Sequence, residues 1–518
     1  MAYKFGIRSS LTLLGLQTSK QHLGIARKGL IRMQQTRAAM ENVDTKSYDQ
    51  IPGPKGLPLV GTLFDYVRNK GHTRVHEIQA ERVQEYGEIY REKLLGLDTV
   101  TISNADDVQY LFRNEGKYPQ REPQFPLWMK YKEERKQAHG VFSLQGEDWF
   151  KVRRVLNMKM LKPKVVGEYS KPLNDVISDL LHRTKQTRDS DGGIPDIQQE
   201  LFKWSLESVG TVLFETRFGT FGKSPSPEAA KFIEAVGKMF NLILKVYVIP
   251  LWIDKFYRPK SFREFYDCMD VMYDFGNSCI ENKLSEIRRR LENGEEQDED
   301  AAEFLSFLIS RDDISSTEIT ANLVEILMAA VETTSNTSLW TLYLLARNPS
   351  VQKQLHEEVS AVLQPGELAT PATLQKMPFL RGCVKETLRL YPVATENARM
   401  LQEDIAIQGY RIPPNTMIRV PLYAMGRDPA LFDDPLEYKP DRWLRDDTSK
   451  SHYHAFASQP FGFGTRMCLG RRVAELEMHL LLSRVSQNFW LESLNEVKPR
   501  ITALLVPDGE VKLRFIDR

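Results

Sequence analysis

The chain has 518 residues, of which 42% are hydrophobic and 27% are charged, and its formal net charge is +1. This composition excludes a disordered or fibrous protein and predicts a large globular core. The four cysteines form no Cys-x-x-Cys pair, so a zinc ribbon and a disulfide framework are also excluded, and a reducing compartment is favoured. We expect no nucleic-acid partner.

The first 40 residues differ in charge from the rest of the chain. They contain seven of the 70 basic residues and none of the 69 acidic ones. An acid-free leader with Arg and Ser/Thr is typical of a mitochondrial transit peptide, although a disordered basic arm is the alternative. The longest apolar run, Leu11 to Leu16, is far shorter than the ~20 residues that a membrane span needs. We therefore expect residues 1–40 to be a transit peptide with an approximate cleavage point, and residues 41–518 to be the functional part.

The folded region begins at residues 51–58, where three prolines and two glycines predict an extended segment. The pattern is then mostly helical. Alternating segments at residues 89–95, 99–102 and about 405–420 predict strands. The apolar run at residues 240–253 is too short and too interrupted to span a bilayer. It either dips into one membrane leaflet or forms an ordinary core helix and loop.

One long helix is predicted between a capping box at Ser315 and Glu318 and the proline at 349. About 30 residues of helix would measure ~45 Å, which is enough to cross a domain. Its middle places Glu332 and Thr333 between apolar flanks. Because burying an unpaired carboxyl is costly, Glu332 is a candidate functional residue. The alternative for Thr333 is a hydroxyl that only bonds back to its own helix.

A second helix carries residues 381–389 and ends at Tyr391, before a proline. Glu386 and Arg389 are three residues apart, so they share a face and can pair. Arg381 and Lys385 lie roughly 90° around the same helix and form a separate basic stripe. This stripe is either a docking surface or an ordinary solvated face.

The segment FGFGTRMCLG, residues 461–470, surrounds Cys468 with three glycines and an arginine, and we name it the thiolate segment. A helical pattern follows Gly470, so the cysteine precedes a helix N-terminus, where an anion is favoured. Nearby positive charge and backbone donors lower the basicity of a thiolate. A nucleophile would need a histidine base, and none of the nine histidines lies in a comparable motif. A single thiolate ligand to haem iron fits better.

The thiolate segment resembles the haem-binding signature of the cytochromes P-450, Phe-x-x-Gly-x-Arg-x-Cys-x-Gly. Four more motifs of the family lie earlier in the chain, in the family's order: Trp149-x-x-x-Arg153, Ala329-Ala-x-Glu-Thr-Thr334, Glu386-x-x-Arg389 and Pro440-Asp-Arg-Trp443. The resemblance covers about residues 50–518. It implies one large, mainly α-helical P-450 domain with small β-sheets, although length alone suggests about three domains. It also implies a heme b cofactor.

The resemblance implies a role for each matching residue. Cys468 would be the axial iron ligand, and Glu332 with Thr333 would deliver protons while dioxygen is cleaved. The family more often has Gly at Ala330 and Asp at Glu332, which puts the efficiency of coupling in question. Haem contacts are expected from Trp149, Arg153, Arg399, Phe461, Gly464, Arg466 and Gly470. A buried charge network is expected from Glu386, Arg389 and Arg442.

The leader and the basic residues resemble those of the mitochondrial branch of the family. That branch receives electrons from an adrenodoxin-type [2Fe–2S] ferredoxin, which an NADPH-dependent reductase reduces, at the matrix face of the inner membrane. Docking would use Arg381, Lys385, Arg471 and Arg472. Within the branch, the motifs are most similar to the sterol 27-hydroxylase group, which includes vitamin D hydroxylases and a retinoid desaturase. The substrate cavity is expected at Ala329, Val393, Ala394, Thr395 and Leu505.

The resemblance therefore predicts a peripheral membrane monooxygenase that uses O2 to hydroxylate a sterol, secosteroid or retinoid. Three alternatives remain open at this point: desaturation of the same substrates, an electron-independent haem-thiolate isomerase or dehydratase, and a haem or lipid carrier without activity. Cavity shape rather than motifs decides the substrate.

Overall fold

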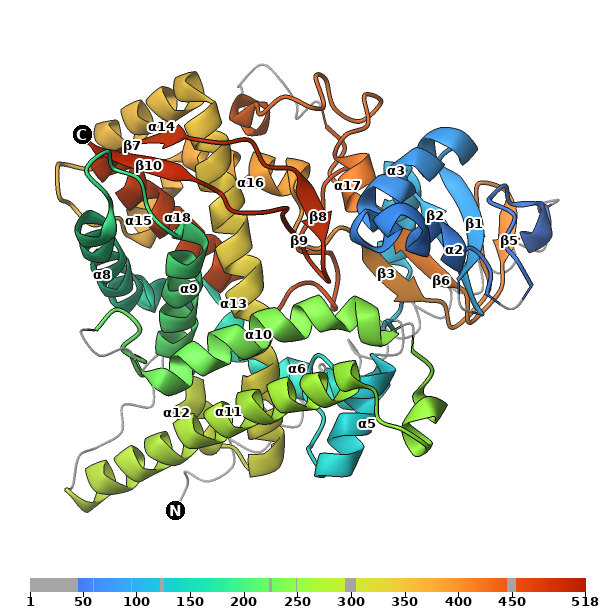
Figure 1. The fold of residues 1–518 in the computed structure, drawn as a ribbon, viewed down its shortest axis with the longest axis horizontal. Coiled ribbons are helices and arrows are strands. Elements are labelled where there is room, and N and C mark those ends of the chain that lie inside the picture. The colour runs from blue at the N-terminus through green and yellow to red at the C-terminus, as the bar shows by residue number, and fades with distance from the viewer. Residues whose placement is uncertain are drawn as a thin grey trace, which may run out of the picture.

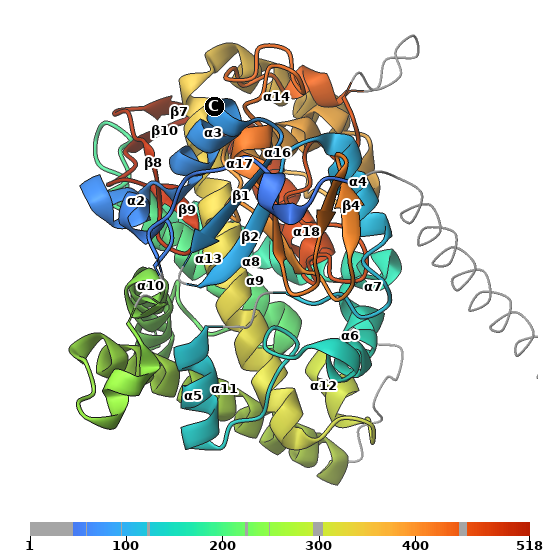
Figure 2. The same ribbon diagram turned by 90° about the vertical axis from the view of Figure 1, so that its right-hand side faces the viewer.

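The computed structural model describes residues 45–518 apart from 59, 95, 122–124, 223–225, 248, 294–303 and 445–452. The expected transit peptide lies outside the described residues. The described chain is mainly α-helical, as the sequence predicts, with its largest sheet at one side of the helical body (Figures 1 and 2).

The helices follow the chain in a long series. Their bounds are α2 Leu63–Val67, α3 Val75–Tyr86, α4 Ala105–Arg113, α5 Pro126–Arg135, α6 Gly146–Met160, α7 Pro163–Glu168, α8 Ser170–Thr187, α9 Ile197–Leu213, α10 Pro227–Tyr247, α11 Lys260–Glu292, α12 Phe304–Ile309, α13 Ser316–Arg347, α14 Pro349–Val362, α15 Pro371–Gln375, α16 Pro378–Leu390, α17 Leu422–Met425 and α18 Arg471–Asn488. Short 3₁₀ turns are η1 Tyr48–Gln50, η2 Arg68–Thr73, η3 Leu251–Lys255 and η4 Pro440–Trp443.

The strands form one four-stranded sheet and three two-stranded ones. The larger sheet has the order β1-β2-β6-β3, and only its β2–β6 pair is parallel. Its strands are β1 Ile89–Leu94, β2 Leu97–Ile102, β3 Asn397–Met400 and β6 Met417–Val420. The small antiparallel pairs are β4 Ile405–Ile407 with β5 Tyr410–Ile412, β7 Phe489–Ser493 with β10 Leu513–Asp517, and β8 Pro499–Ile501 with β9 Leu505–Pro507. The strands expected near residues 89–102 and 405–420 are therefore confirmed.

The long helix predicted from the capping box is α13. Ser315 is its N-cap, and the backbone N–H of Ser315 donates to the Glu318 carboxylate at 2.8 Å. The helix ends at Arg347, just before the proline at 349. It runs through the middle of the helical body and packs against α9, α11 and α16 (Figure 1). Most of α13 beyond its first turn is buried, so the surrounding elements pack directly against its middle turns.

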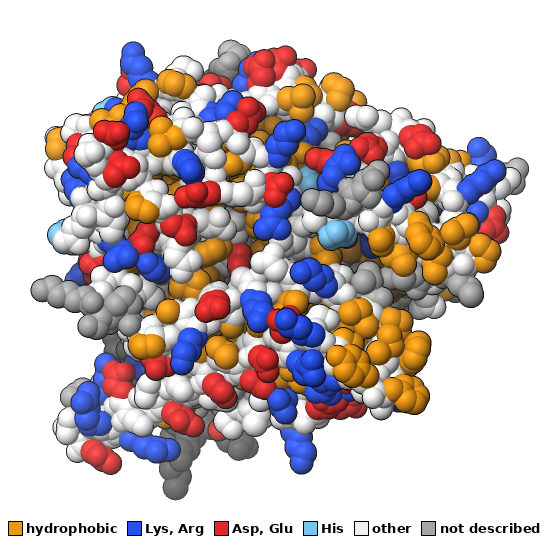
Figure 3. Space-filling model, viewed as in Figure 1, with side chains coloured by type: hydrophobic (Ala, Val, Ile, Leu, Met, Phe, Trp, Pro, Cys, Tyr) orange, Lys and Arg blue, Asp and Glu red, His pale blue; other side chains and the backbone are white. Residues whose placement is uncertain are grey.

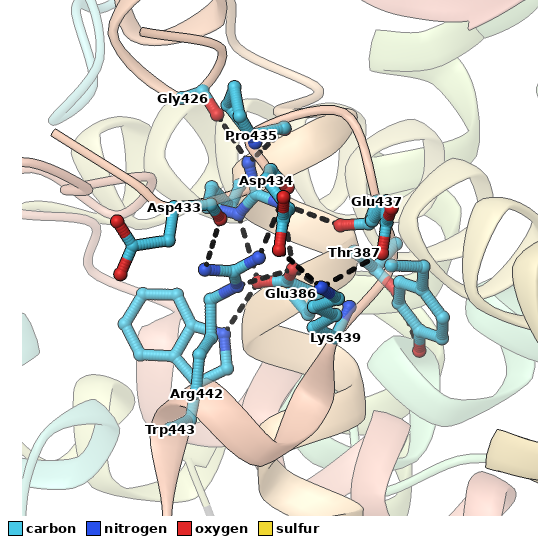
Figure 4. A network of polar contacts seen from close by, with 12 residues as sticks. Glu386, Thr387, Gly426, Asp433, Asp434, Pro435, Glu437, Lys439, Arg442 and Trp443 are labelled. Carbon is cyan, nitrogen blue, oxygen red and sulfur yellow. Dashed lines mark hydrogen bonds and ion pairs between the residues drawn. The ribbon is translucent and has the colours of Figure 1, made fainter. Parts of the chain in front are cut away.

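Helix α16 contributes a buried charge network (Figure 4). The Arg389 guanidinium binds both oxygens of the Glu386 carboxylate, at 2.6 and 2.9 Å, and both side chains are fully buried. Arg442 Nε and the indole N–H of Trp443 also donate to this carboxylate, each at 2.8 Å. Arg389 donates further to the carbonyls of Pro435 and Glu437. The network thus joins α16 to η4 and to the loop before it, upstream of the thiolate segment.

We expect Glu386→Gln to lower the free energy of unfolding by about 3–5 kcal/mol, because two arginines lose their buried anion. Chemical denaturation followed by circular dichroism measures this change. Glu437→Gln is the control, since its exposed carboxylate pairs with Lys439 at the surface, at 2.9 Å. That variant should lose less than about 1 kcal/mol. Equal losses in the two variants would contradict the expectation.

Candidate active site

The thiolate segment is a tight loop that ends at the N-terminus of α18. Gly462 and Gly464 have φ angles of 67° and 76°, which glycine adopts without strain. A Cβ atom at Gly464 would lie 2.2 Å from a Glu115 oxygen, so this position also has no room for a side chain. The Cys468 N–H donates to the Phe461 carbonyl at 2.7 Å. Gly470 is the N-cap residue of α18.

Burial raises the pKa of the Cys468 thiol, while the Gly470 N–H and the guanidinium groups of Arg153 and Arg121 oppose this effect. The protein alone therefore disfavours ionisation of the thiol. A metal cation at the sulfur would displace the proton, since thiolate is the form that ligates metals. The site thus has the donor that haem iron requires, in a position where the free thiolate is disfavoured.

Four arginines lie close enough to Cys468 or to one another to interact. They are Arg121, Arg153, Arg399 and Arg466, and we name them the arginine cluster. Burial, and then repulsion by the other three, lower the pKa of Arg466 to about 9. Among the described residues, the cluster makes one ion pair, between Arg399 and Glu115. The Nε atom of Arg153 is buried without a hydrogen-bond partner. This uncompensated charge fits the two propionate groups of haem.

The cluster is fixed to the thiolate segment by hydrogen bonds. Arg153 donates to the Met467 carbonyl at 2.6 Å, and Arg121 donates to the Arg466 carbonyl at 2.8 Å. The Arg466 guanidinium lies 3.8 Å from the Trp149 ring centroid. It also donates to the Gln145 side chain at 2.6 Å. The structure therefore brings the expected haem residues of α6, β3 and the thiolate segment together.

Three members of this site were missed by the sequence reasoning, namely Glu115, Arg121 and Gln145. Glu115 and Arg121 lie in loop sequence without periodicity, and Gln145 is the residue before α6. Glu115 is 284 residues from its partner Arg399. No local signal identifies such contacts.

The buried middle of α13 has one partly exposed face, which we name the open face. Within residues 321–346, which are all described, only Ala329, Ala330 and Thr333 are partly exposed. Their spacing places them on one face, so a space lies beside these turns. The Thr333 hydroxyl donates back to the Ala329 carbonyl at 2.8 Å. This bond is compatible with both interpretations of Thr333, so its role stays a prediction.

Glu332 is buried between α13 and α10. One carboxyl oxygen accepts from Asn336 Nδ2 at 2.9 Å, and the other faces Gly237, where an added Cβ would lie 3.4 Å away. Burial raises the pKa of Glu332 to about 7, although the Asn336 hydrogen bond opposes the rise. A carboxyl that titrates near neutral pH can both accept and release a proton. Glu332 and Thr333 are adjacent in sequence, but no hydrogen bond between their side chains is recorded.

The expected docking residues lie on two packed helices, α16 and α18. Lys385 is exposed, with its ammonium 5.7 Å from the Trp443 ring centroid. Burial, followed by the charges of Arg381 and Lys385, lowers the pKa of His479 on α18 to about 3, so both cations lie near that helix. Arg471 pairs with Glu475 at 3.1 Å, and Arg472 is exposed.

The expected cavity residues come from α13, from the segment after α16 and from β9. The Leu505 N–H donates to the Val393 carbonyl at 2.9 Å. The Leu505 carbonyl accepts from the indole N–H of Trp340 on α13, at 3.2 Å. Thr395 is buried, whereas Ala394 is exposed. The segment around Val393 and strand β9 are therefore held against each other and against α13.

A family model described as cytochrome P-450 matches residues 51–515. The chain belongs to the cytochrome P-450 family. Cytochrome P-450 10 of Lymnaea stagnalis is 37% identical over 482 residues, 92% of this chain and 87% of its own length. Mitochondrial sterol 26-hydroxylase of Rattus norvegicus is 36% identical over 486 residues, 91% of this chain and 89% of its own length. Mitochondrial 25-hydroxyvitamin D-1 alpha hydroxylase of Homo sapiens is 34% identical over 482 residues, 91% of this chain and 93% of its own length.

These similarities confirm the predicted fold, the heme b cofactor with a cysteine thiolate ligand, and the class of a P-450 monooxygenase. The thiolate segment and the arginine cluster fit that cofactor. Within the described part of this P-450, no helix has both the length and the apolar character to cross a membrane.

The raised pKa of Glu332 predicts a pH-dependent stability. A carboxyl with a pKa of about 7 in the folded chain and about 4.5 when unfolded binds its proton more tightly in the folded state. The carboxyl of the unsubstituted protein (the parent) therefore does not lower the free energy of unfolding below pH 4.5. As the pH rises from 4.5 through 7, the unfolded chain loses this proton more readily than the folded one, and the free energy of unfolding falls. We expect Glu332→Gln to gain up to about 3 kcal/mol relative to the parent between about pH 5 and pH 8. Urea unfolding of both proteins across this range measures the difference. A pH-independent difference would contradict the assignment.

Proposed function

We propose that this P-450 is a mitochondrial hydroxylase of a sterol, secosteroid or retinoid, with electrons supplied by a ferredoxin. The observation that carries the proposal is the meeting of Cys468 and the arginine cluster in one site. The names of the similar proteins, a sterol hydroxylase and a vitamin D hydroxylase, support the substrate class.

Each residue has a part in the proposed mechanism. Bound haem supplies the activation of dioxygen. Cys468 holds the iron, and the arginine cluster holds the carboxylates of the cofactor, where charge-assisted hydrogen bonds are strong. Glu332 holds a proton at its carboxyl near neutral pH, while Thr333 offers a hydroxyl beside the open face of α13. The buried surroundings keep bulk water from delivering protons indiscriminately.

We expect Cys468→Ala to lose the reduced carbon monoxide difference band of thiolate haem, because the axial donor is absent. Cys279→Ala, which removes a thiol from α11, is the matched control and should keep the band. An unchanged band in Cys468→Ala would refute the ligand assignment.

The competing activities have a direct test. Spectral titration with cholesterol derivatives, vitamin D and retinol, followed by product analysis, identifies the substrate and separates hydroxylation from desaturation. Product formed without ferredoxin and NADPH would favour an isomerase or dehydratase. Absence of turnover across the panel with a competent ferredoxin would favour a carrier.

The basic residues on α16 and α18 support an acidic [2Fe–2S] ferredoxin, reduced by an NADPH-ferredoxin reductase, as the electron donor. Complementary charge mainly sets the rate and the register of docking. Arg381 and Lys385 lie on the helix that holds Glu386, and Arg471 directly follows the thiolate segment. A partner on this surface would therefore be near the axial cysteine.

We expect Lys385→Glu to raise the KM for ferredoxin by roughly tenfold at low ionic strength, because like charge then opposes docking. The effect should shrink as salt screens the charges. Lys231→Glu is the control, since Lys231 is exposed on α10. Steady-state kinetics against ferredoxin concentration measure both variants, and equal KM values would contradict the proposed surface.

We also propose peripheral contact with the matrix face of the inner membrane, after import directed by residues 1–40. Exposed aromatics lie within the connection between α10 and α11: Trp252 is 62% exposed and Phe256 84%. Phe64 on α2 is 58% exposed. Figure 3 shows orange side chains gathered on the right, over the regions where Figure 1 places α2 and the connection between α10 and α11. Of the apolar run at residues 240–253, residues 240–247 form the end of α10 and residues 251–253 lie in η3.

We expect the double variant Trp252→Ser, Phe256→Ser to bind lipid vesicles at least about tenfold more weakly, since burying a large apolar side chain contributes about 1.5–3 kcal/mol. Leu436→Ser is the control, because Leu436 is 72% exposed in the loop before η4. Vesicle flotation measures the bound fraction. Equal binding by parent and double variant would exclude this contact.

A further inference from the structure

Glu325 lies on α13, one turn before Ala329, and is almost completely buried. Its carboxylate accepts from the Lys132 ammonium at 2.7 Å, and neither side chain is exposed. Lys132 comes from α5, so the pair joins this helix to α13. A buried ion pair of this kind is costly to form unless further hydrogen bonds satisfy it.

The further hydrogen bonds come from the loop between α5 and α6. The N–H groups of Gly140 and Phe142 donate to the Glu325 carboxylate at 3.1 and 2.8 Å, and the Ser143 hydroxyl donates at 2.6 Å. The Val141 N–H donates to Asn322, also on α13, at 2.7 Å. A Cβ atom at position 140 would lie 2.5 Å from the carboxylate. The loop is therefore folded directly onto one carboxyl group.

The same loop continues into the arginine cluster. The Leu144 carbonyl accepts from Arg466 Nη2 at 3.2 Å, and the Gln145 side chain accepts from the same atom at 2.6 Å. Helix α6 then begins at Gly146 and carries Trp149 and Arg153. Only one residue separates the last donor to Glu325 from the side chain that orients Arg466. The loop thus connects α13, one turn before its open face, to the arginine cluster.

We propose that Glu325 is a positioning residue for haem, which acts through this loop on Arg466, Trp149 and Arg153. The proposal rests on the proposed haem site. Lys132 neutralises the carboxylate, and the carboxylate fixes the loop in the conformation that presents the arginine cluster. Partners that orient the groups holding a metal centre typically change affinity by about 10–100-fold when they are removed.

The test measures haem retention rather than activity. In Glu325→Gln the side chain keeps its size, but an NH2 group replaces an oxygen that accepts hydrogen bonds. We expect the holoenzyme of this variant to transfer haem to apomyoglobin at least about tenfold faster than the parent. Ser143→Ala removes one of the donors to Glu325, together with the contacts of its hydroxyl to Gly140, so it should accelerate transfer less and in the same direction. The second variant decides the question if the first does not fold.

Glu207→Gln is the matched control. Glu207 on α9 is also fully buried, and it accepts from Arg217 at 2.8 Å and from the Phe218 N–H at 3.0 Å. Its loss should lower stability without accelerating haem transfer. Equal transfer rates at equal stability in the Glu325 and Glu207 variants, or no acceleration in Ser143→Ala, would overturn the proposal. The carbon monoxide band of the parent tests the haem site separately, so failure of that site is distinguishable.

Discussion

The constraint on which the site depends is the cost of placing a thiolate inside a protein. Burial disfavours ionisation of the Cys468 thiol, and the nearby guanidinium groups only reduce that effect. The sulfur becomes a stable anion when a metal cation binds it. The arginines around it are themselves buried and repel one another, so they need anions of their own. One dianionic, metal-containing cofactor meets both needs, because its iron and its carboxylates balance the two unfavourable charges together.

This constraint explains why so many distant segments meet at residues 461–470. The short loop that carries Cys468 cannot by itself hold the cysteine and the arginine cluster in place. Arg466 is instead held by the carbonyl of Pro119 and by the side chain of Gln145. The Glu386 network fixes the chain upstream, while α18 begins directly downstream. The neighbouring segments thus hold the loop in place. Glycine is required only where the loop turns or where it approaches Glu115.

Sequence reasoning found those features whose signal is local. The capping box of α13 and the spacing of Glu386 and Arg389 each depend on residues within one helical turn, so both could be placed in advance. The thiolate segment was recognisable because its composition is unusual. Arg121 and Glu115 could not be found in this way, since their partners lie hundreds of residues away. Glu325 was also missed, because its partner Lys132 is 193 residues distant and only tertiary packing brings them together.

The two sides of the site differ in how firmly the chain prepares them. On the thiolate side, Arg466 and Arg153 already have backbone or side-chain acceptors, so the cofactor finds its cationic groups in place. On the side of α13, Thr333 still bonds to its own helix and Glu332 contacts Asn336 rather than Thr333. Under the proposed function, these groups would have to exchange their local bonds for others when substrate and dioxygen bind. Proton delivery would then wait until the reactants are present.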